Sequence, residues 1–236
     1  IYDRNGVMVA ENVKVYVMYM IPVYLPKNYF EREELLYRVS KIFNIDLGQI
    51  KSILDKVPKN SYESIEIANN ITMEQISYLA ERSEEYPGVY YGSKSVRNYP
   101  LGETMTHILG YIGNISQEEF EDKRAEGYRR NSMIGKEGVE QFYDRELRGI
   151  DGYVQWIVDS RNRVKETISP AVGRPIPGKK LILSIDSKIQ KDAEDLLYGQ
   201  VGTIIVSRPT TGEILAMVSA PWYDPNIFIG KIDRDK

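Results

Sequence analysis

The chain has 236 residues, of which 42% are hydrophobic and 28% charged, a composition typical of a globular protein with a buried core. Its net charge of −3 comes from 31 basic and 34 acidic residues, so no basic surplus exists to neutralise phosphates and nucleic acid is not expected as a partner. There is no cysteine and one histidine, His107, which excludes disulfides, thiolate metal sites and a histidine-rich zinc site. We expect neither a metal nor a cofactor.

The first 24 residues are expected to form strands. Asn5-Gly6 lies between two short apolar runs, which is typical of a hairpin turn. Apolar residues then recur at every second position, and this period predicts a strand with one well-defined apolar face. The residues of that face are Val13, Val15, Val17 and Tyr19. No apolar run here or later reaches the roughly 18 residues that a membrane span needs.

Residues 28–86 favour helices. Two Asp/Thr-to-Gln pairs at a spacing of three resemble capping boxes, which mark helix starts. Residues 64–68 alternate like a strand between them. We expect a small helical subdomain inserted between strands. The two pairs are Asp46 with Gln49, and Thr72 with Gln75.

Between residues 87 and 168 the pattern changes repeatedly between strands and short helices. Ser116 followed by Glu119 marks one helix start, and Gly149 is expected to end another helix. The expected elements are strands over residues 87–113 with a short helix at 104–109, helices at 116–126 and 136–148, and a hairpin of 153–159 with 164–168.

Residues 170–178 hold three prolines and two glycines and are the best linker candidate. Beyond them we expect a strand at 181–185, a helix capped by Asp186 that runs to residue 197, and two strands at 203–207 and 213–219. This short unit would expose sheet edges that nothing in the sequence covers, so more chain is expected to follow.

A search for catalytic chemistry finds little. No serine is followed by lysine three residues later, and neither K-T-G nor K-S-G occurs. The S-x-N match at residues 160–162 lies in a predicted hairpin and is interpreted as chance. The spacing of the 34 acidic residues singles out no pair of catalytic carboxylates of the kind found in glycosidases. A lone histidine such as His107 is more often packed in the structure than catalytic. We therefore predict no catalytic residue and no metal ligand in this chain.

Four segments are similar to class B penicillin-binding proteins, in the family's order and at about its spacing. They read IYDRNG at the start, then RNYPLG followed by HILGYIG, then GKEGVE, and finally LSID, PTTGEILAMVS and YDPN. Thr106 stands where this family commonly has alanine. The motif residues are interpreted as architectural, with glycines for close backbone approach and Arg97 as a candidate bidentate partner of Glu140. The predicted structural residues are Asp3, Arg4, Gly6, Arg97, Tyr99, Pro100, Gly102, His107, Gly110, Gly113, Gly135, Gly138, Glu140, Asp186, Gly212, Asp224, Pro225 and Asn226.

The resemblance implies an α+β fold with an elongated pedestal of strands that carries an inserted helical head subdomain. Residues 1–176 would be the pedestal, or dimerisation, domain, with the head at about 25–95. Residues 177–236 would be the first strand, helix and hairpin of a β-lactamase-like transpeptidase domain, truncated before its catalytic serine. The YDPN ending and the helical insertion resemble the elongation-type enzyme, penicillin-binding protein 2.

The resemblance also implies a role without catalysis. This region would couple a peptidoglycan-crosslinking domain to a polytopic glycosyltransferase and a rod-shape scaffold protein in cell-wall synthesis and elongation. Stem peptides and β-lactams would bind only through the missing domain. A membrane anchor is expected upstream of Ile1, with this region on the periplasmic or extracellular side.

Two alternatives stay open at this point. One is a stand-alone structural adaptor of the cell envelope, and the other is a peptidoglycan hydrolase that acts through carboxylates. The tyrosine-rich face of residues 13–24 and the helices expected at 31–55 are the candidate partner surfaces.

Overall fold

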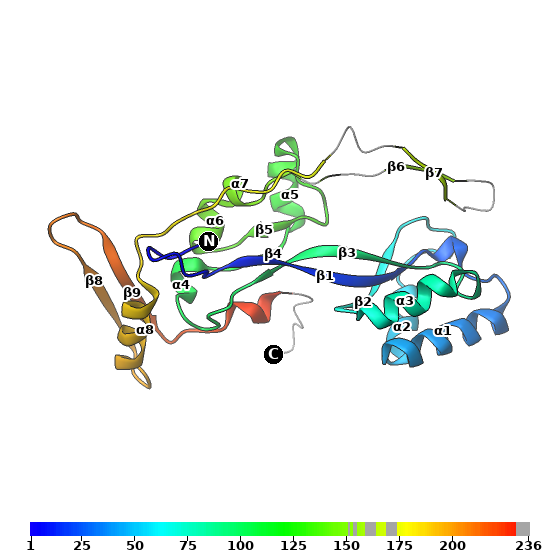
Figure 1. Ribbon diagram of the computed structural model, residues 1–236, viewed down its shortest axis with the longest axis horizontal. Helices are drawn as coiled ribbons and strands as arrows, with labels where there is room; N and C mark the ends of the chain where they lie inside the picture. Colours follow the sequence, from blue (N-terminus) through cyan, green and yellow to red (C-terminus); the bar gives the residue numbers. More distant parts are fainter. Residues whose placement is uncertain (151, 153–154, 159–163, 169–173, 230–236) are drawn as a thin grey trace. The chain divides into compact units, whose positions relative to one another are not determined.

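The computed structural model describes residues 1–150, 152, 155–158, 164–168 and 174–229, and for residues 155–158 and 164–168 it describes the backbone alone (Figure 1). The chain divides into two compact units. Unit 1 comprises Ile1–Glu11 and Arg97–Lys236, and unit 2 is Asn12–Val96, inserted between those two segments. The fold is mixed α/β with several small sheets. No helix in the described ranges is long and apolar enough to cross a membrane.

Unit 2 consists of a three-stranded sheet with strand order β2-β1-β3 and three helices (Figure 1). The strands β1 and β3 also carry the chain from unit 1 into unit 2 and back. The elements are β1 (Glu11–Met20), η1 (Pro22–Tyr24), α1 (Tyr29–Phe43), α2 (Leu47–Leu54), β2 (Ile65–Asn69), α3 (Met73–Glu81), η2 (Ser83–Glu85) and β3 (Val89–Asn98).

Two helices of unit 2, α2 and α3, begin where the sequence predicted. The Asp46 side chain accepts a hydrogen bond from the Gln49 N–H and starts α2. Thr72 and Gln75 form the complete capping box of α3. The helices then bury Leu35, Val39 and other apolar side chains against one face of the sheet. Burial of this kind stabilises by about 1.5–3 kcal/mol for each large aliphatic side chain.

The prediction of a single apolar face on β1 is wrong, because both faces are apolar. Met18 and Met20 are fully buried and belong to the core beneath the helices. Neighbouring residues of a strand point to opposite faces, so Val17 and Tyr19 lie on the other face of the sheet. That second face includes the predicted Val13 and Val15, which are only partly buried.

In its described residues, unit 1 holds three two-stranded antiparallel sheets, β4-β5, β6-β7 and β8-β9, together with helices. Its core includes Val9, Tyr99 and Leu109. The elements are α4 (Thr106–Leu109), β4 (Ile112–Asn114), α5 (Gln117–Lys123), η3 (Arg124–Glu126), β5 (Met133–Gly135), α6 (Gly138–Phe142), α7 (Asp144–Leu147), β6 (Gln155–Val158), β7 (Val164–Ile168), α8 (Ser187–Leu196), β8 (Gly202–Ser207), β9 (Ile214–Ala220) and η4 (Pro225–Phe228).

Two further predictions for unit 1 need correction. The helix expected at residues 136–148 is interrupted at Tyr143 and forms α6 and α7. The segment at 181–185 is not a full strand: it pairs with residues 2–4 through an isolated bridge from Ile182 to Tyr2 and a bond from the Arg4 N–H to the Ile185 carbonyl. The expected hairpin of β6 and β7 is present, and the S-x-N match between these strands lies outside the described residues.

Candidate functional site

The predicted motif residues meet in unit 1, where they form what we call the motif junction: the contacts within and among residues 1–11, 97–144 and 181–229. At its centre lies a buried ion pair. Arg97 Nε donates to Glu140 Oε1 at 2.7 Å, with side chains 9% and 3% exposed. The Tyr99 hydroxyl donates to the same oxygen at 3.2 Å. Burial, followed by the nearby Glu140 charge, raises the pKa of Tyr99, so this hydroxyl stays a donor.

The N-terminal turn forms a second part of the junction. Asp3 is fully buried and accepts hydrogen bonds from the N–H groups of Asn5 and Val7, both at 2.8 Å. The same carboxylate accepts from the Ser187 hydroxyl at 2.7 Å and the Ser187 N–H at 3.1 Å. Asp186 caps α8 and accepts from the Asn5 side chain at 2.9 Å. The turn is therefore fixed to the N-terminus of α8.

The remaining N-terminal and hairpin motif residues lie at the surface of this region. Arg4 approaches Glu213 at 3.5 Å and donates to the Ser184 carbonyl. Gly6 and Gly212 have positive φ angles of 82° and 75° in open turns, where glycine is the preferred residue.

This second part of the junction predicts an acid-dependent stability. Burial opposes ionisation of Asp3, but hydrogen bonds from Ser187 and from the Val7 and Asn5 backbone outweigh it and hold the pKa below its usual value. A carboxylate whose pKa is lower in the folded than in the unfolded chain stabilises the fold at pH values above its unfolded pKa, which is ~3.9 for Asp. This stabilisation is lost as the pH falls through the pKa of the folded state. Ser187→Ala is therefore expected to lose less unfolding free energy than wild type when the pH is lowered from about 5 to about 3.

The measurement is urea unfolding of unit 1 at several pH values, followed by tryptophan fluorescence. Both tryptophans, Trp156 and Trp222, belong to unit 1. Lys188→Ala, an exposed neighbour on α8, serves as the control. Equal slopes for wild type and Ser187→Ala would contradict the role given to these hydrogen bonds.

Three glycines allow helix α4 and strand β5 to approach α6 at backbone distance. A Cβ atom at Gly110 would lie 2.0 Å from the Glu137 carbonyl oxygen, and one at Gly138 would lie 2.5 Å from that of Ile108. At Gly135 the distance to the Glu140 carbonyl oxygen would be 2.1 Å. Any side chain at these positions would force the backbones apart.

The other two glycines of this region have more room. A Cβ at Gly113 would meet only the Lys136 side chain, at 3.2 Å. Gly102, with a φ of 58°, closes the turn that Pro100 opens and has no atom within 4 Å of an added Cβ.

Hydrogen bonds of polar side chains fix the segment after β9. Asn226 accepts from the Tyr99 N–H and donates to the Tyr99 carbonyl, both at 3.0 Å. Asp224 caps η4, and Pro225 is buried in it. His107 Nε2 lies 2.9 Å from the Pro221 carbonyl oxygen, so the single histidine makes a backbone contact. These residues hold residues 221–229 against the 97–109 segment.

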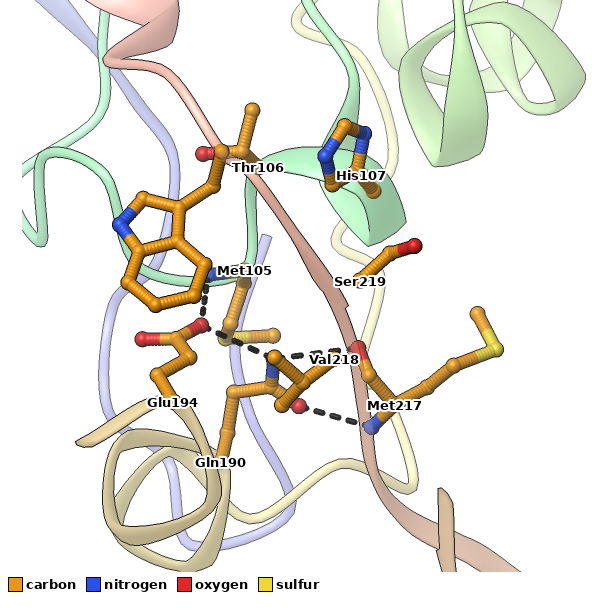
Figure 2. A pocket seen from close by; sticks show the side chains of 9 residues that line it. Met105, Thr106, His107, Gln190, Glu194, Met217, Val218 and Ser219 are labelled. Atoms are coloured by element: carbon orange, nitrogen blue, oxygen red, sulfur yellow. Dashed lines mark hydrogen bonds between the residues drawn. The ribbon is translucent and has the colours of Figure 1, made fainter. Parts of the chain in front are cut away.

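One part of the junction, the carboxylate of Glu194, is not among the residues predicted from the sequence. It is 4% exposed, and Oε1 accepts from the Met105 N–H and from Gln190 Nε2, both at 2.9 Å (Figure 2). Gln190 also bonds both backbone groups of Met217. A cavity of about 10 Å³ lies beside them, enough for about one water molecule. The spacing of four between Gln190 and Glu194 places both on one helical face, which was the available signal.

None of these contacts forms a catalytic arrangement. A serine acyl-enzyme needs a nucleophile next to a positioned base, and the hydrogen bonds of the junction instead satisfy backbone groups and buried charges. Within the described residues no group of three acidic or histidine side chains could hold a metal ion.

The comparisons with known proteins agree with the motif pattern. Residues 1–183 match the family model of the penicillin-binding protein dimerisation domain. The chain is 32% identical to the peptidoglycan D,D-transpeptidase MrdA of Salmonella typhimurium LT2, over all of this chain and 39% of that protein. It is 32% identical to MrdA of Escherichia coli K12, over 98% of this chain and 36% of that protein. The chain thus spans about two fifths of the length of these curated relatives.

Solved structures give the same result. Penicillin-binding protein 2 of Helicobacter pylori, in its complex with MreC, matches 99% of this chain and 43% of that chain, with a TM-score of 0.77 and 25% identity. The same protein alone matches with a TM-score of 0.73 and 25% identity, over all of this chain and 44% of its own. The chain therefore belongs to the penicillin-binding protein dimerisation domain family and is similar to the pedestal of penicillin-binding protein 2.

Proposed function

We propose that this chain is the non-catalytic pedestal region of an elongation-type peptidoglycan D,D-transpeptidase, and that it couples the crosslinking domain to its partners. The observation that carries the proposal is the 32% identity to MrdA over the whole chain. The motif junction supports it, because buried polar contacts and close backbone approaches would hold a following domain in a fixed orientation on the pedestal.

In this proposal the finer organisation follows the family. Residues 1–176 are the pedestal domain with a helical head at about 25–95, and residues 177–236 begin the β-lactamase-like transpeptidase domain. The hairpin of β8 and β9, covered on one face by α8, is its first hairpin. The eighteen motif residues act as architecture in this arrangement, and a membrane anchor holds the pedestal at the periplasmic or extracellular surface of the cell membrane.

The proposed partners are a scaffold protein of the MreC kind and a polytopic glycosyltransferase. For the scaffold, helix α1 offers an exposed aromatic surface. Tyr29 and Phe30 are 67% and 80% exposed and lie in edge contact at 5.7 Å. Tyr37, which is 52% exposed, lies seven residues after Phe30 and so on the same side of the helix. Exposed aromatic clusters of this kind are enriched in protein interfaces.

The test is binding of this chain to the extracytoplasmic part of the scaffold protein of the same organism, measured by calorimetry. The wild-type chain is expected to bind, and Phe30→Ala is expected to weaken binding about tenfold or more. Lys59→Ala, an exposed substitution outside the helices, is the control. Fluorescent penicillin is expected to label the longer parent protein and not this chain. The absence of scaffold binding by the wild-type chain would overturn the coupling role.

A further inference from the structure

A row of tyrosines starts on the second face of the unit 2 sheet and continues onto η1 and the loop before β2, and the proposed function does not use it. Tyr19 stacks on Tyr90 with ring centroids 5.8 Å apart. Tyr24 meets Tyr90 edge to face at 6.4 Å and Tyr62 edge to face at 5.9 Å. We call these four residues the tyrosine platform. Tyr62, at the end of the row, is 70% exposed, and the other three are partly exposed.

The local structure leaves the tyrosine rings of the platform uncovered. Tyr19 and Tyr90 lie on the face opposite Met18 and Met20, so the helical core does not cover them. Gly92 has no side chain where the Tyr19 ring lies, since a Cβ there would be 3.2 Å from the ring. The strand therefore presents the ring pair without an obstructing side chain next to it.

The hydroxyl groups of the platform are available to a ligand. Among the described residues they have no hydrogen-bond partner, and none of them is a fully buried polar atom. Burial raises the pKa of Tyr19 and of Tyr90, so both phenols remain protonated donors at neutral pH. The platform thus combines aromatic faces with four free hydroxyl groups.

The charge beside the platform is balanced. Lys94 Nζ lies 2.6 Å from the Glu66 carboxylate, and Glu66 is the strand partner of Tyr19. The two charges of this pair cancel, so the pair itself favours neither an acidic nor a basic ligand. Its exposed groups can still exchange hydrogen bonds with hydroxyl or amide groups.

A row of uncharged aromatic rings with free hydroxyls, beside an ion pair whose charges cancel, suits an uncharged carbohydrate polymer. Sugar rings have apolar C–H faces that stack on aromatic rings and hydroxyl groups that form hydrogen bonds. They follow one another along a polysaccharide, as the tyrosine rings follow one another along the row. Tyrosine is also enriched at protein interfaces, so a protein partner is the outcome that the test must exclude. We propose that the tyrosine platform is a glycan-binding site that contacts a neutral polysaccharide strand of the cell wall.

The choice of a cell-wall glycan rests on the proposed function, whereas carbohydrate binding itself rests on the platform alone. The probe is the β-1,4-linked tetramer of N-acetylglucosamine, titrated into the 236-residue chain by calorimetry. Wild type is expected to bind it, and Tyr62→Ala is expected to raise the Kd about tenfold. Tyr62→Phe, which keeps the ring and removes the hydroxyl, is expected to raise it by a smaller factor.

Tyr198→Ala is the control, because Tyr198 is an 81% exposed tyrosine that lies in unit 1, outside the platform. Its Kd for the tetramer is expected to equal that of wild type. No binding by wild type, or equal binding by wild type and Tyr62→Ala, would overturn the proposal. Loss of scaffold binding in Tyr62→Ala with unchanged tetramer binding would also overturn it and would assign the platform to a protein partner. Scaffold binding by Phe30→Ala is measured in a separate experiment, so failure of the scaffold-coupling proposal can be distinguished from failure of the glycan-binding proposal.

Discussion

Replacing Glu140 by glutamine is expected to lower the free energy of unfolding of unit 1 by about 3 to 5 kcal/mol. The substitution removes the negative charge that faces the Arg97 guanidinium, and both side chains are more than nine-tenths buried. A buried charge that loses its counter-charge costs far more than an exposed ion pair contributes. The Tyr99 hydroxyl loses its charged acceptor in the same step.

Urea unfolding followed by tryptophan fluorescence measures this effect in unit 1 alone, since unit 2 contains no tryptophan. Glu118→Gln, on the exposed side of α5, is the control and is expected to change stability by less than about 0.5 kcal/mol. Hydrogen exchange of α1 should stay unchanged in both variants, because α1 belongs to unit 2. A shift for Glu140→Gln no larger than the control would show that the ion pair does not stabilise the junction.

The second large effect is expected for Gly110→Ala, which should cost about 4 kcal/mol or more and prevent stable folding of unit 1. Gly110 has φ 69° and ψ −152°, a conformation that is essentially restricted to glycine. An added Cβ would also lie 2.0 Å from the Glu137 carbonyl oxygen, so α4 and α6 would have to separate. Backbone strain at position 110 and the steric clash with Glu137 therefore both destabilise the Gly110→Ala variant.

Gly102→Ala separates these two causes. Gly102 also has a positive φ, 58°, but an added Cβ meets no atom within 4 Å. This control should cost only the backbone strain, about 1 kcal/mol. Thermal unfolding of both variants, followed by tryptophan fluorescence, measures the difference. Similar costs for the two substitutions would show that close packing of α4 on α6 is not what requires glycine at position 110.

The sequence predicted local features well, because their causes lie within a few residues. Helix starts at Asp46, Thr72 and Ser116 depend on a side chain that bonds an N–H three residues later, and all three are confirmed. The Arg97–Glu140 contact could be expected from a resemblance, although the two residues are 43 positions apart. Its burial could not be read from the sequence.

The failures share a long-range cause. The break at Tyr143 coincides with a bond from the Gly135 N–H to the Asp144 side chain at 2.8 Å, a contact between β5 and the start of α7. The burial of Met18 on β1 depends on helices that lie later in the chain. Glu194 was missed because, apart from its helical neighbour Gln190, its partner is the backbone of Met105, 89 residues away, and backbone groups leave no trace in a sequence.

The insertion of unit 2 through β1 and β3 has a consequence for how this family can change. The residues that flank the insertion are already neighbours, since Asn98 Nδ2 donates to Glu11 Oε1 at 3.0 Å within unit 1. A segment that leaves and returns at one place can be lengthened, shortened or exchanged without altering the path of the remaining chain. Unit 2 can therefore be exchanged like an interchangeable module without disturbing the glycines and buried charges of the junction.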